Sequence, residues 1–228
     1  MIASSRLLKN EIKKFKFKKK IKIIKNQSLN SLKLENRSIY LLNVNYRYKF
    51  EKKEYLRKSF ELAFSIIKSG ITNKFINGPI NKSKFFNHKY LGMTEYISKK
   101  FKTKNFAMLI YNENLSVCPL TTHLPLKLVP KNINKKLIIS TTKLIEKFYK
   151  KNLGFKPKIA ITGLNPHCES ILNYNEDEKI VSPAIRSLKK EGINIKGPFP
   201  ADTIFLKQNR DKFDVILGMY HDQVLSPM

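Results

Sequence analysis

The fold of the chain follows from the stretch Ile159-Ala160-Ile161-Thr162-Gly163-Leu164-Asn165-Pro166-His167-Cys168-Glu169. The uncharged run 159–162 predicts a buried strand, and the residues from Gly163 to Pro166 predict the loop that follows it. His167 therefore lies where a strand ends. This is the place at which α/β proteins gather their functional groups.

Two further histidines occupy the same kind of position. His123 follows an apolar run that ends at Leu120, and His221 follows the run Val215–Gly218. Neutral imidazoles from three strand ends can converge on one divalent ion. The alternative is that each histidine only hydrogen-bonds the backbone where its strand ends. The fourth histidine, His88, lies in a polar loop and is expected to be exposed.

Helical and strand patterns alternate along the chain, which predicts an α/β fold with a mainly parallel sheet. Strands are expected at Ile2–Ser5, Lys18–Lys25, Ser38–Asn45, Phe75–Asn77, Lys158–Thr162 and Phe213–Gly218. Helices are expected at Arg6–Phe17, Glu51–Ser69, Glu95–Phe101, Asn132–Lys151 and Glu176–Glu191. A β-hairpin is expected from Ala107–Tyr111 and Leu115–Leu120, and a rigid turn at Gly197–Asp202.

The composition is that of a soluble globular protein. The 228 residues, 42% of them hydrophobic, suffice for one large or two small domains. No apolar run approaches the roughly 18 to 20 residues of a membrane helix, and the N-terminus lacks a secretory signal, so we expect a cytoplasmic protein without a membrane partner. Cys118 and Cys168 are too few for a disulfide framework. Cys168 is more typical of a small buried residue than of a nucleophile.

The net charge of +28 raises the question of nucleic-acid binding. Only six of the 45 basic residues are arginines, and the lysines are spread along the whole chain. A protein that reads bases or phosphates would be expected to use more arginine, because its planar guanidinium binds bidentately. The pattern indicates a general compositional bias and no specific nucleic-acid partner, although non-specific binding of polyanions is expected at low salt.

Two carboxylates lie close to the predicted turns. Asp202 and Asp222 could each orient a metal-bound imidazole or act as a general base. The structural alternatives are an N-cap for Asp202, ahead of Thr203–Phe205, and a turn cap for Asp222.

Two further residues are candidates for binding an anionic substrate. Thr94 lies at a predicted helix start, where backbone N–H groups can hold a phosphate, although helix capping explains it equally well. Lys82 follows the Gly78-Pro79 turn and could place a cation beside such a substrate.

Six motifs in this order resemble a known family. They are Gly78-Pro79-Ile80-Asn81-Lys82, Gly92-Met93-Thr94-Glu95, Thr121-Thr122-His123-Leu124-Pro125-Leu126, Gly163-Leu164-Asn165-Pro166-His167, Gly197-Pro198-Phe199-Pro200-Ala201-Asp202-Thr203 and Met219-Tyr220-His221-Asp222-Gln223. Together they resemble the 4-hydroxythreonine-4-phosphate dehydrogenases of vitamin B6 biosynthesis, through nearly the whole chain.

The resemblance implies a two-domain α/β/α fold related to the isocitrate and isopropylmalate dehydrogenases, with residues 1–228 spanning parts of two intertwined domains. It implies a homodimer with the active site at the subunit interface. NAD would oxidise the phosphorylated substrate 4-phosphohydroxy-L-threonine, and loss of CO2 would give 3-amino-2-oxopropyl phosphate. The family's metal ligands fall on His123, His167 and His221, and Asp202 is our candidate for assisting proton removal. Zinc, cobalt and magnesium remain open, with nitrogen ligands favouring a transition metal.

The chain also departs from the family's pattern. Met93 stands where the family carries a substrate-binding histidine, and 168–171 replaces a glycine-rich continuation. The family's upstream Gly-rich turn and its C-terminal lysine, asparagine and arginine are absent, so no NAD-binding residue is assigned and we expect an internal fragment that is inactive by itself. Two other functions stay open: a basic nucleic-acid-binding module, and a metal-dependent hydrolase on the same scaffold.

Overall fold

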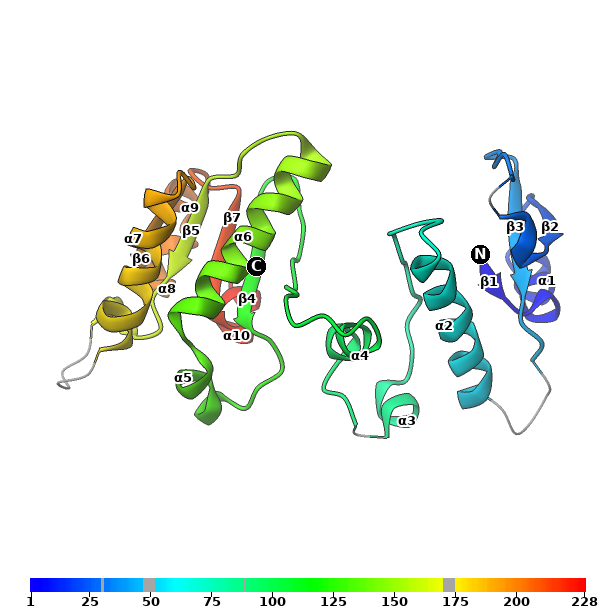
Figure 1. The fold of residues 1–228 in the computed structure, drawn as a ribbon, viewed down its shortest axis with the longest axis horizontal. Helices are drawn as coiled ribbons and strands as arrows, with labels where there is room; N and C mark the ends of the chain where they lie inside the picture. Colours follow the sequence, from blue (N-terminus) through cyan, green and yellow to red (C-terminus); the bar gives the residue numbers. More distant parts are fainter. Residues whose placement is uncertain (30, 47–51, 88, 170–174) are drawn as a thin grey trace. The chain divides into compact units, whose positions relative to one another are not determined.

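The computed structural model describes residues 1–29, 31–46, 52–87, 89–169 and 175–228 (Figure 1). The expectation that His88 is exposed lies outside these residues. The chain divides into two compact units, Met1–Lys89 and Tyr90–Met228, and each is treated separately below. Within the described residues, no helix has both the length and the apolar character needed to cross a membrane.

The first unit contains a three-stranded parallel sheet in the order β1-β3-β2. Its strands are β1 (Ile2–Ala3), β2 (Lys20–Ile24) and β3 (Ser38–Asn43), and helix α1 (Ser5–Lys14) connects the first two. All four elements were expected from the sequence. β3 is central because Leu41 and Leu42 are buried, whereas β2 carries lysines and is largely exposed.

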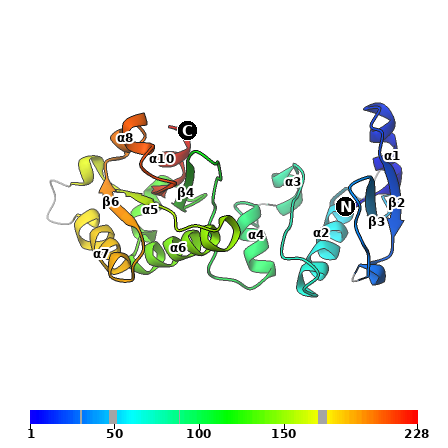
Figure 2. The same cartoon turned by 90° about the horizontal axis from the view of Figure 1, so that it is seen from above.

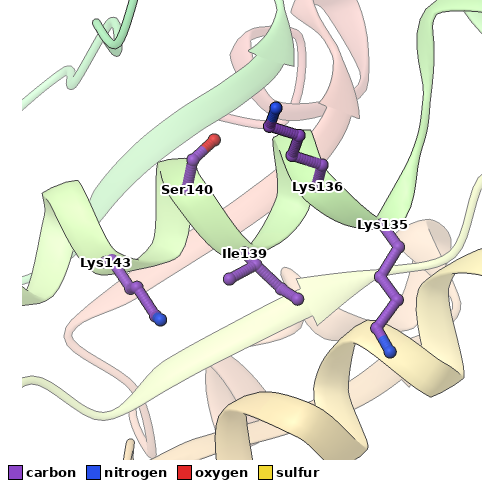
Figure 3. A pocket seen from close by; sticks show the side chains of 5 residues that line it. All are labelled: Lys135, Lys136, Ile139, Ser140 and Lys143. Atoms are coloured by element: carbon purple, nitrogen blue, oxygen red, sulfur yellow. The ribbon is translucent and has the colours of Figure 1, made fainter.

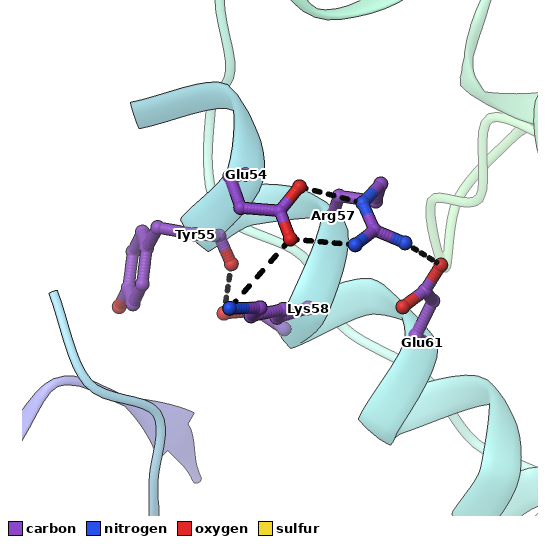
Figure 4. A network of polar contacts seen from close by, with 6 residues as sticks. Glu54, Tyr55, Arg57, Lys58 and Glu61 are labelled. Atoms are coloured by element: carbon purple, nitrogen blue, oxygen red, sulfur yellow. Dashed lines mark hydrogen bonds and ion pairs between the residues drawn. The ribbon is translucent and has the colours of Figure 1, made fainter. Parts of the chain in front are cut away.

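Helix α2 (Lys52–Lys68) is amphipathic, as its sequence predicts. Its apolar face buries Phe60, Ala63, Phe64 and Ile66. On its exposed face the Arg57 guanidinium lies between the carboxylates of Glu54 and Glu61, three and four residues away (Figure 4). Ion pairs in water contribute little to folding, so the buried face is what fixes this helix.

The prediction of a buried strand at Phe75–Asn77 was wrong. These residues form no strand, and the Ile76 side chain is 96% exposed. The ring of Phe75 instead packs at 5.7 Å from that of Phe60 and 5.8 Å from that of Phe64. These three residues pair with no strand in the described part of the chain, and Phe75 packs against α2 instead. The short helix α3 (Lys82–Phe86) follows.

The second unit is built on a four-stranded parallel sheet, which confirms the predicted α/β class. Its strands are β4 (Ser116–Thr121), β5 (Ile159–Thr162), β6 (Ile195–Phe199) and β7 (Val215–Tyr220). The order is β4-β7-β5-β6, so the last strand in sequence lies between β4 and β5. The three strands that precede histidines are therefore neighbours, and their carboxyl ends lie at one edge of the sheet.

Helices cover both faces of this sheet (Figure 2). α6 (Lys135–Phe148) and α7 (Ser182–Lys190) cover one face, where Ile138 and Leu188 pack with strand residues such as Ile161 and Leu217. On the other face, α8 (Ala201–Ile204) and α10 (His221–Leu225) contribute Ile204 and Val224 to a second apolar cluster. The remaining helices are α4 (Met93–Lys100), α5 (Val129–Asn132) and α9 (Lys207–Arg210).

Two expectations about strands need correction. The predicted hairpin at 107–120 is reduced to a single antiparallel bridge between Ile110 and Val117, and the ladder of β4 is formed with β7, in parallel. Part of the predicted turn Gly197–Asp202 belongs to β6, which the sequence analysis missed. The Gly197-Pro198 pair is typical of a turn, so its sequence did not predict a strand. β6 can contain a proline because it lies at the edge of the sheet.

Candidate functional site

His123 and His221 face each other at the carboxyl edge of the second unit's sheet. His123 lies two residues beyond β4, and His221 begins α10 directly after β7. β4 and β7 are paired, with Thr121 opposite Tyr220. The two imidazole rings lie 5.8 Å apart between centroids, inclined at 39°. Strand pairing thus brings together two histidines that are far apart in sequence.

Each of these rings has a carboxylate beside its Nδ1 atom. Glu95 Oε1 lies 3.3 Å from Nδ1 of His123, and Asp222 Oδ1 lies 2.8 Å from Nδ1 of His221. An ionised carboxylate only accepts hydrogen bonds, so an Nδ1–H group on each ring can donate to it, and in a neutral ring of that tautomer Nε2 carries the lone pair. Metal-binding histidines are commonly held in this way, and imidazole nitrogens are donors of a type that divalent transition metals accept.

Glu95 is the residue of this site that the sequence analysis missed as a functional group. It lies in the first turn of α4, and its Oε1 also accepts a hydrogen bond from Thr122 Oγ1 at 2.8 Å. Its Oε2 is buried and has no hydrogen-bond partner among the described residues. Burial raises the pKa of Glu95, but the hydrogen bonds from Thr122, its own backbone and His123 outweigh this effect and leave the pKa below its ordinary value.

His167 follows β5, on the other side of β7 from β4. Its backbone is in the left-handed region, with φ at 56°, and its side chain is exposed. Across the described part of the chain, no three His, Cys, Asp or Glu side chains are grouped closely enough to hold a metal. The structure brings His123 and His221 together and leaves His167 on the neighbouring strand end, so the three-histidine site stays a prediction.

The loop that carries His167 is fixed by Asp177, which the sequence analysis also missed. Asp177 is 1% exposed and accepts hydrogen bonds from the backbone N–H groups of Leu164 and Asn165 at 2.6 and 3.0 Å. The Asn165 side chain donates to the same carboxylate. An acidic residue in a helical turn gave no signal beyond the helix dipole, because its partners lie 12 and 13 residues earlier.

Asp202 occupies the second position of α8, at the end of the edge strand β6, and its side chain is exposed. The structural alternative, that Asp202 is an N-cap, does not hold, because Pro200 is the N-cap of α8 and Asp202 is the second residue of the helix. The pKa of the Cys168 thiol is raised to about 11, mainly by burial and further by the charges of Asp177 and Asp202. Cys168 is therefore protonated at neutral pH, which argues against a nucleophilic thiolate, but it is only partly buried and not the buried residue that the sequence predicted.

The predicted substrate-binding residues fall in different units. Thr94 is the second residue of α4, directly before Glu95, and Gly92 is the N-cap. Lys82 is the first residue of α3 in the first unit and is exposed.

The two described hollows of the surface contain none of the expected site residues. One, of about 510 Å³, lies on the outer face of α6 and is lined by Lys135, Lys136, Ile139, Ser140 and Lys143 (Figure 3). The other, of about 460 Å³, is lined mainly by apolar side chains between α6 and the segment 106–111. Neither brings together the polar groups that catalysis needs, so the histidine edge of the sheet remains the candidate site.

Several proteins with assigned names are similar in sequence to this chain. One from Sulfurihydrogenibium, named 4-hydroxythreonine-4-phosphate dehydrogenase, is 44% identical over 142 residues, or 61% of this chain and 43% of the relative. One of the same name from Aquifex aeolicus is 42% identical over 153 residues, covering 65% and 47%. A D-threonate 4-phosphate dehydrogenase from Pectobacterium atrosepticum is 32% identical over 170 residues, covering 73% and 52%. The chain spans about half the length of these relatives.

Solved structures share the fold. Crystal structures of 4-hydroxythreonine-4-phosphate dehydrogenases from Klebsiella pneumoniae and Burkholderia phymatum each match with a TM-score of 0.80, at 24% and 25% identity. Each match covers 99% of this chain, and 73% and 72% of the respective structures. The whole sequence, residues 1–228, matches the family described as "Pyridoxal phosphate biosynthetic protein PdxA". The chain belongs to the PdxA family.

Proposed function

We propose that the chain is the metal-binding part of an NAD-dependent 4-hydroxythreonine-4-phosphate dehydrogenase. The reaction is the oxidation of 4-phosphohydroxy-L-threonine at its carbinol carbon, with NAD as the oxidant, followed by loss of CO2 to give 3-amino-2-oxopropyl phosphate. The observation that carries this proposal is the pair His123 and His221, each with a carboxylate on Nδ1, at the carboxyl edge of a parallel sheet. Membership of the PdxA family and the names of the relatives support it.

The proposed metal ligands are His123, His221 and His167. The first two meet across paired strands, and the third follows β5, the other neighbour of β7. Three imidazole nitrogens favour zinc or cobalt over magnesium, which prefers oxygen ligands. A metal bound there would polarise the substrate's hydroxyl group and lower its pKa.

The remaining roles fall to side chains around this edge. Asp202 is the proposed acceptor of the hydroxyl proton, because it is exposed at the end of β6, the strand next to β5. Thr94, in the first turn of α4, is proposed to hydrogen-bond the substrate's phosphate with the N–H groups of that turn. Lys82 is proposed to place a positive charge beside the anionic substrate. A homodimer with the active site at its interface, and the isocitrate dehydrogenase-like domain arrangement, complete the proposal.

An absorbance assay tests this function. Protein expressed from the complete coding region is mixed with NAD, zinc or cobalt and 4-phosphohydroxy-L-threonine, and NADH is followed at 340 nm. We expect NADH formation that a chelator stops and added metal restores. His167→Ala should abolish both metal binding and activity, and Asp202→Asn should lower kcat with little change in metal affinity. No NADH under any of these conditions would overturn the proposal.

Further measurements separate the other candidate functions. D-threonate 4-phosphate is a second substrate to test, because one relative carries that name at 32% identity. Metal-dependent release of phosphate without NADH would instead identify a hydrolase. Sequence-selective binding of DNA or RNA that survives physiological salt, without metal, would identify a nucleic-acid-binding module.

A further inference from the structure

The strongest feature that the proposed function does not use is the partly buried carboxylate of Glu95. It is third in α4, a position where acidic residues often serve only to complement the helix dipole. A residue with that role alone would need no side-chain contact outside its own helix. Glu95 instead crosses to the loop after β4, where its Oε1 meets both Thr122 Oγ1 and His123 Nδ1.

The other oxygen of this carboxylate is left without such a contact. Glu95 Oε2 is buried without a hydrogen-bond partner in the part of the chain that the structure describes. A buried anionic oxygen without a partner is unfavourable unless a positive charge lies nearby. A cation on Nε2 of His123 would make the ring positively polarised and its Nδ1–H a stronger donor to Glu95.

The backbone around Glu95 leaves room for this contact. Gly92 is the N-cap of α4, and a Cβ atom there would lie 2.7 Å from Cε1 of His123 and 2.8 Å from Oε2 of Glu95. Both distances are too short for non-bonded atoms. The helix start and the histidine therefore approach one another because position 92 has no side chain.

The carboxylate at the second histidine differs. Asp222 also meets an imidazole Nδ1, but its side chain is 80% exposed, whereas that of Glu95 is 21% exposed. Water can replace Asp222 as an acceptor, but it cannot readily reach the Glu95 contact. Of the two carboxylates, Glu95 is therefore the one that water cannot readily replace.

We propose that Glu95 is a positioning residue for metal binding: its carboxylate holds His123 as the Nδ1–H tautomer, so that Nε2 is presented to a metal shared with His221. The part of this inference that concerns the metal rests on the proposed function. The part that concerns the tautomer of His123 does not. Glu95 is then a fourth residue, beside the three histidines, that determines the affinity for the metal without binding the ion. Thr122 completes the arrangement by donating to the same oxygen.

Imidazole nitrogen NMR of the metal-free protein tests the tautomer directly. We expect the His123 signals of the unaltered protein to show a protonated Nδ1 and a bare Nε2. In Glu95→Ala the ring should shift towards the Nε2–H form that free histidine prefers. A predominantly Nε2–H ring in the unaltered protein would overturn the inference, whatever the chain does with metals.

Cobalt binding tests the consequence. Titration of the unaltered protein with Co²⁺ gives a Kd and a visible spectrum that reports coordination. Glu95→Gln, which keeps the shape of the side chain, should weaken Kd by about 10 to 100-fold and alter the spectrum. Glu191→Gln is the matched control, because Glu191 pairs with Lys143 on the surface at 2.6 Å and should change neither.

The outcomes separate the two proposals. If His123→Ala binds Co²⁺ as well as the unaltered protein does, the metal site of the proposed function fails, while the NMR result still decides the role of Glu95 on the ring. If His123→Ala loses Co²⁺ but Glu95→Gln keeps both the affinity and the spectrum, the positioning role is wrong. Thermal unfolding of each variant identifies any that have lost the fold.

Discussion

Gln223 is hydrogen-bonded to Thr162 across two strands of the second unit. Its Oε1 accepts from Thr162 Oγ1 at 2.8 Å and from the Met219 backbone N–H at 2.7 Å, while its Nε2 donates to Gly163 O at 2.7 Å. Gln223 lies in α10, just after β7, whereas Thr162 is the last residue of β5 and Gly163 follows it. One buried amide therefore joins the strand ends from which the chain proceeds to His221 and His167.

Replacing Gln223 with alanine is expected to destabilise the second unit. The substitution leaves a buried hydroxyl, a backbone N–H and a backbone carbonyl without their partner, and each such loss costs about 1 to 3 kcal/mol before relaxation. We expect a total loss of about 2 to 4 kcal/mol in the free energy of unfolding, measured with urea. Gln208→Ala, at an exposed position of α9, is the control and should change stability by less than about 0.5 kcal/mol. Equal effects of the two variants would contradict this role.

Much of this edge could be read from the sequence, because its signals are local. Uncharged apolar runs predict β5 and β7, and a histidine after each run marks a strand end. An apolar face repeated at helical spacing predicts α6. Parallel pairing then brings such histidines to one edge, as His123 and His221 show. These inferences need only hydrophobic periodicity and strand direction.

The residues that the sequence did not reveal act through contacts far along the chain. Gln223 reaches back about 60 residues, and Glu95 meets a histidine 28 residues later. Each resembles an ordinary polar residue at the start of a helix, because the adjacent sequence does not indicate which distant residue it will contact. Conversely, Phe75–Asn77 had the composition of a strand, but Ile76 remained exposed because strand formation needs a partner.

Gly218 is expected to tolerate no side chain. It lies in β7, and a Cβ atom there would overlap the Val224 side chain of α10. Gly218→Ala should lower the free energy of unfolding by about 1 to 3 kcal/mol through overpacking. Gly78→Ala is the matched control, because nothing lies within 4 Å of a Cβ atom at that position. Adding Val224→Ala to Gly218→Ala should recover part of the loss, and purely additive effects would argue against the steric explanation.

The Cys118 thiol should make stability fall at high pH. Burial in β4 raises its pKa from the ordinary value of about 9 to about 12. Between these values the unfolded chain has lost the thiol proton and the folded chain retains it, so stability declines as pH rises. The contribution of Cys118 is fully present below about pH 9 and is lost towards about pH 12.

Urea unfolding of the unaltered protein and of Cys118→Ala measures this effect as a difference, so that titration of the many lysines cancels. The stability advantage of the unaltered protein should shrink by about 1 to 2 kcal/mol between about pH 8 and about pH 10.5. A difference that stays constant over this range would show that the thiol does not titrate as its burial requires.

Asp177 should control the order of the loop that leads to His167. Its carboxylate accepts the backbone N–H groups of Leu164 and Asn165 and is itself buried. Asp177→Asn keeps the size of the side chain but turns one acceptor into a donor that faces these N–H groups. We expect a loss of about 1 to 3 kcal/mol in stability and faster hydrogen exchange at residues 164 and 165.

The exposed neighbour Glu178 supplies the control, since Glu178→Gln should leave both quantities unchanged. Faster exchange confined to 164–165, with β5 still protected, would show that Asp177 fixes the loop and not the strand. Because His167 follows two residues later, the same variant should weaken Co²⁺ binding if His167 is a ligand. Loss of loop protection with unchanged Co²⁺ affinity would separate His167 from the pair formed by His123 and His221.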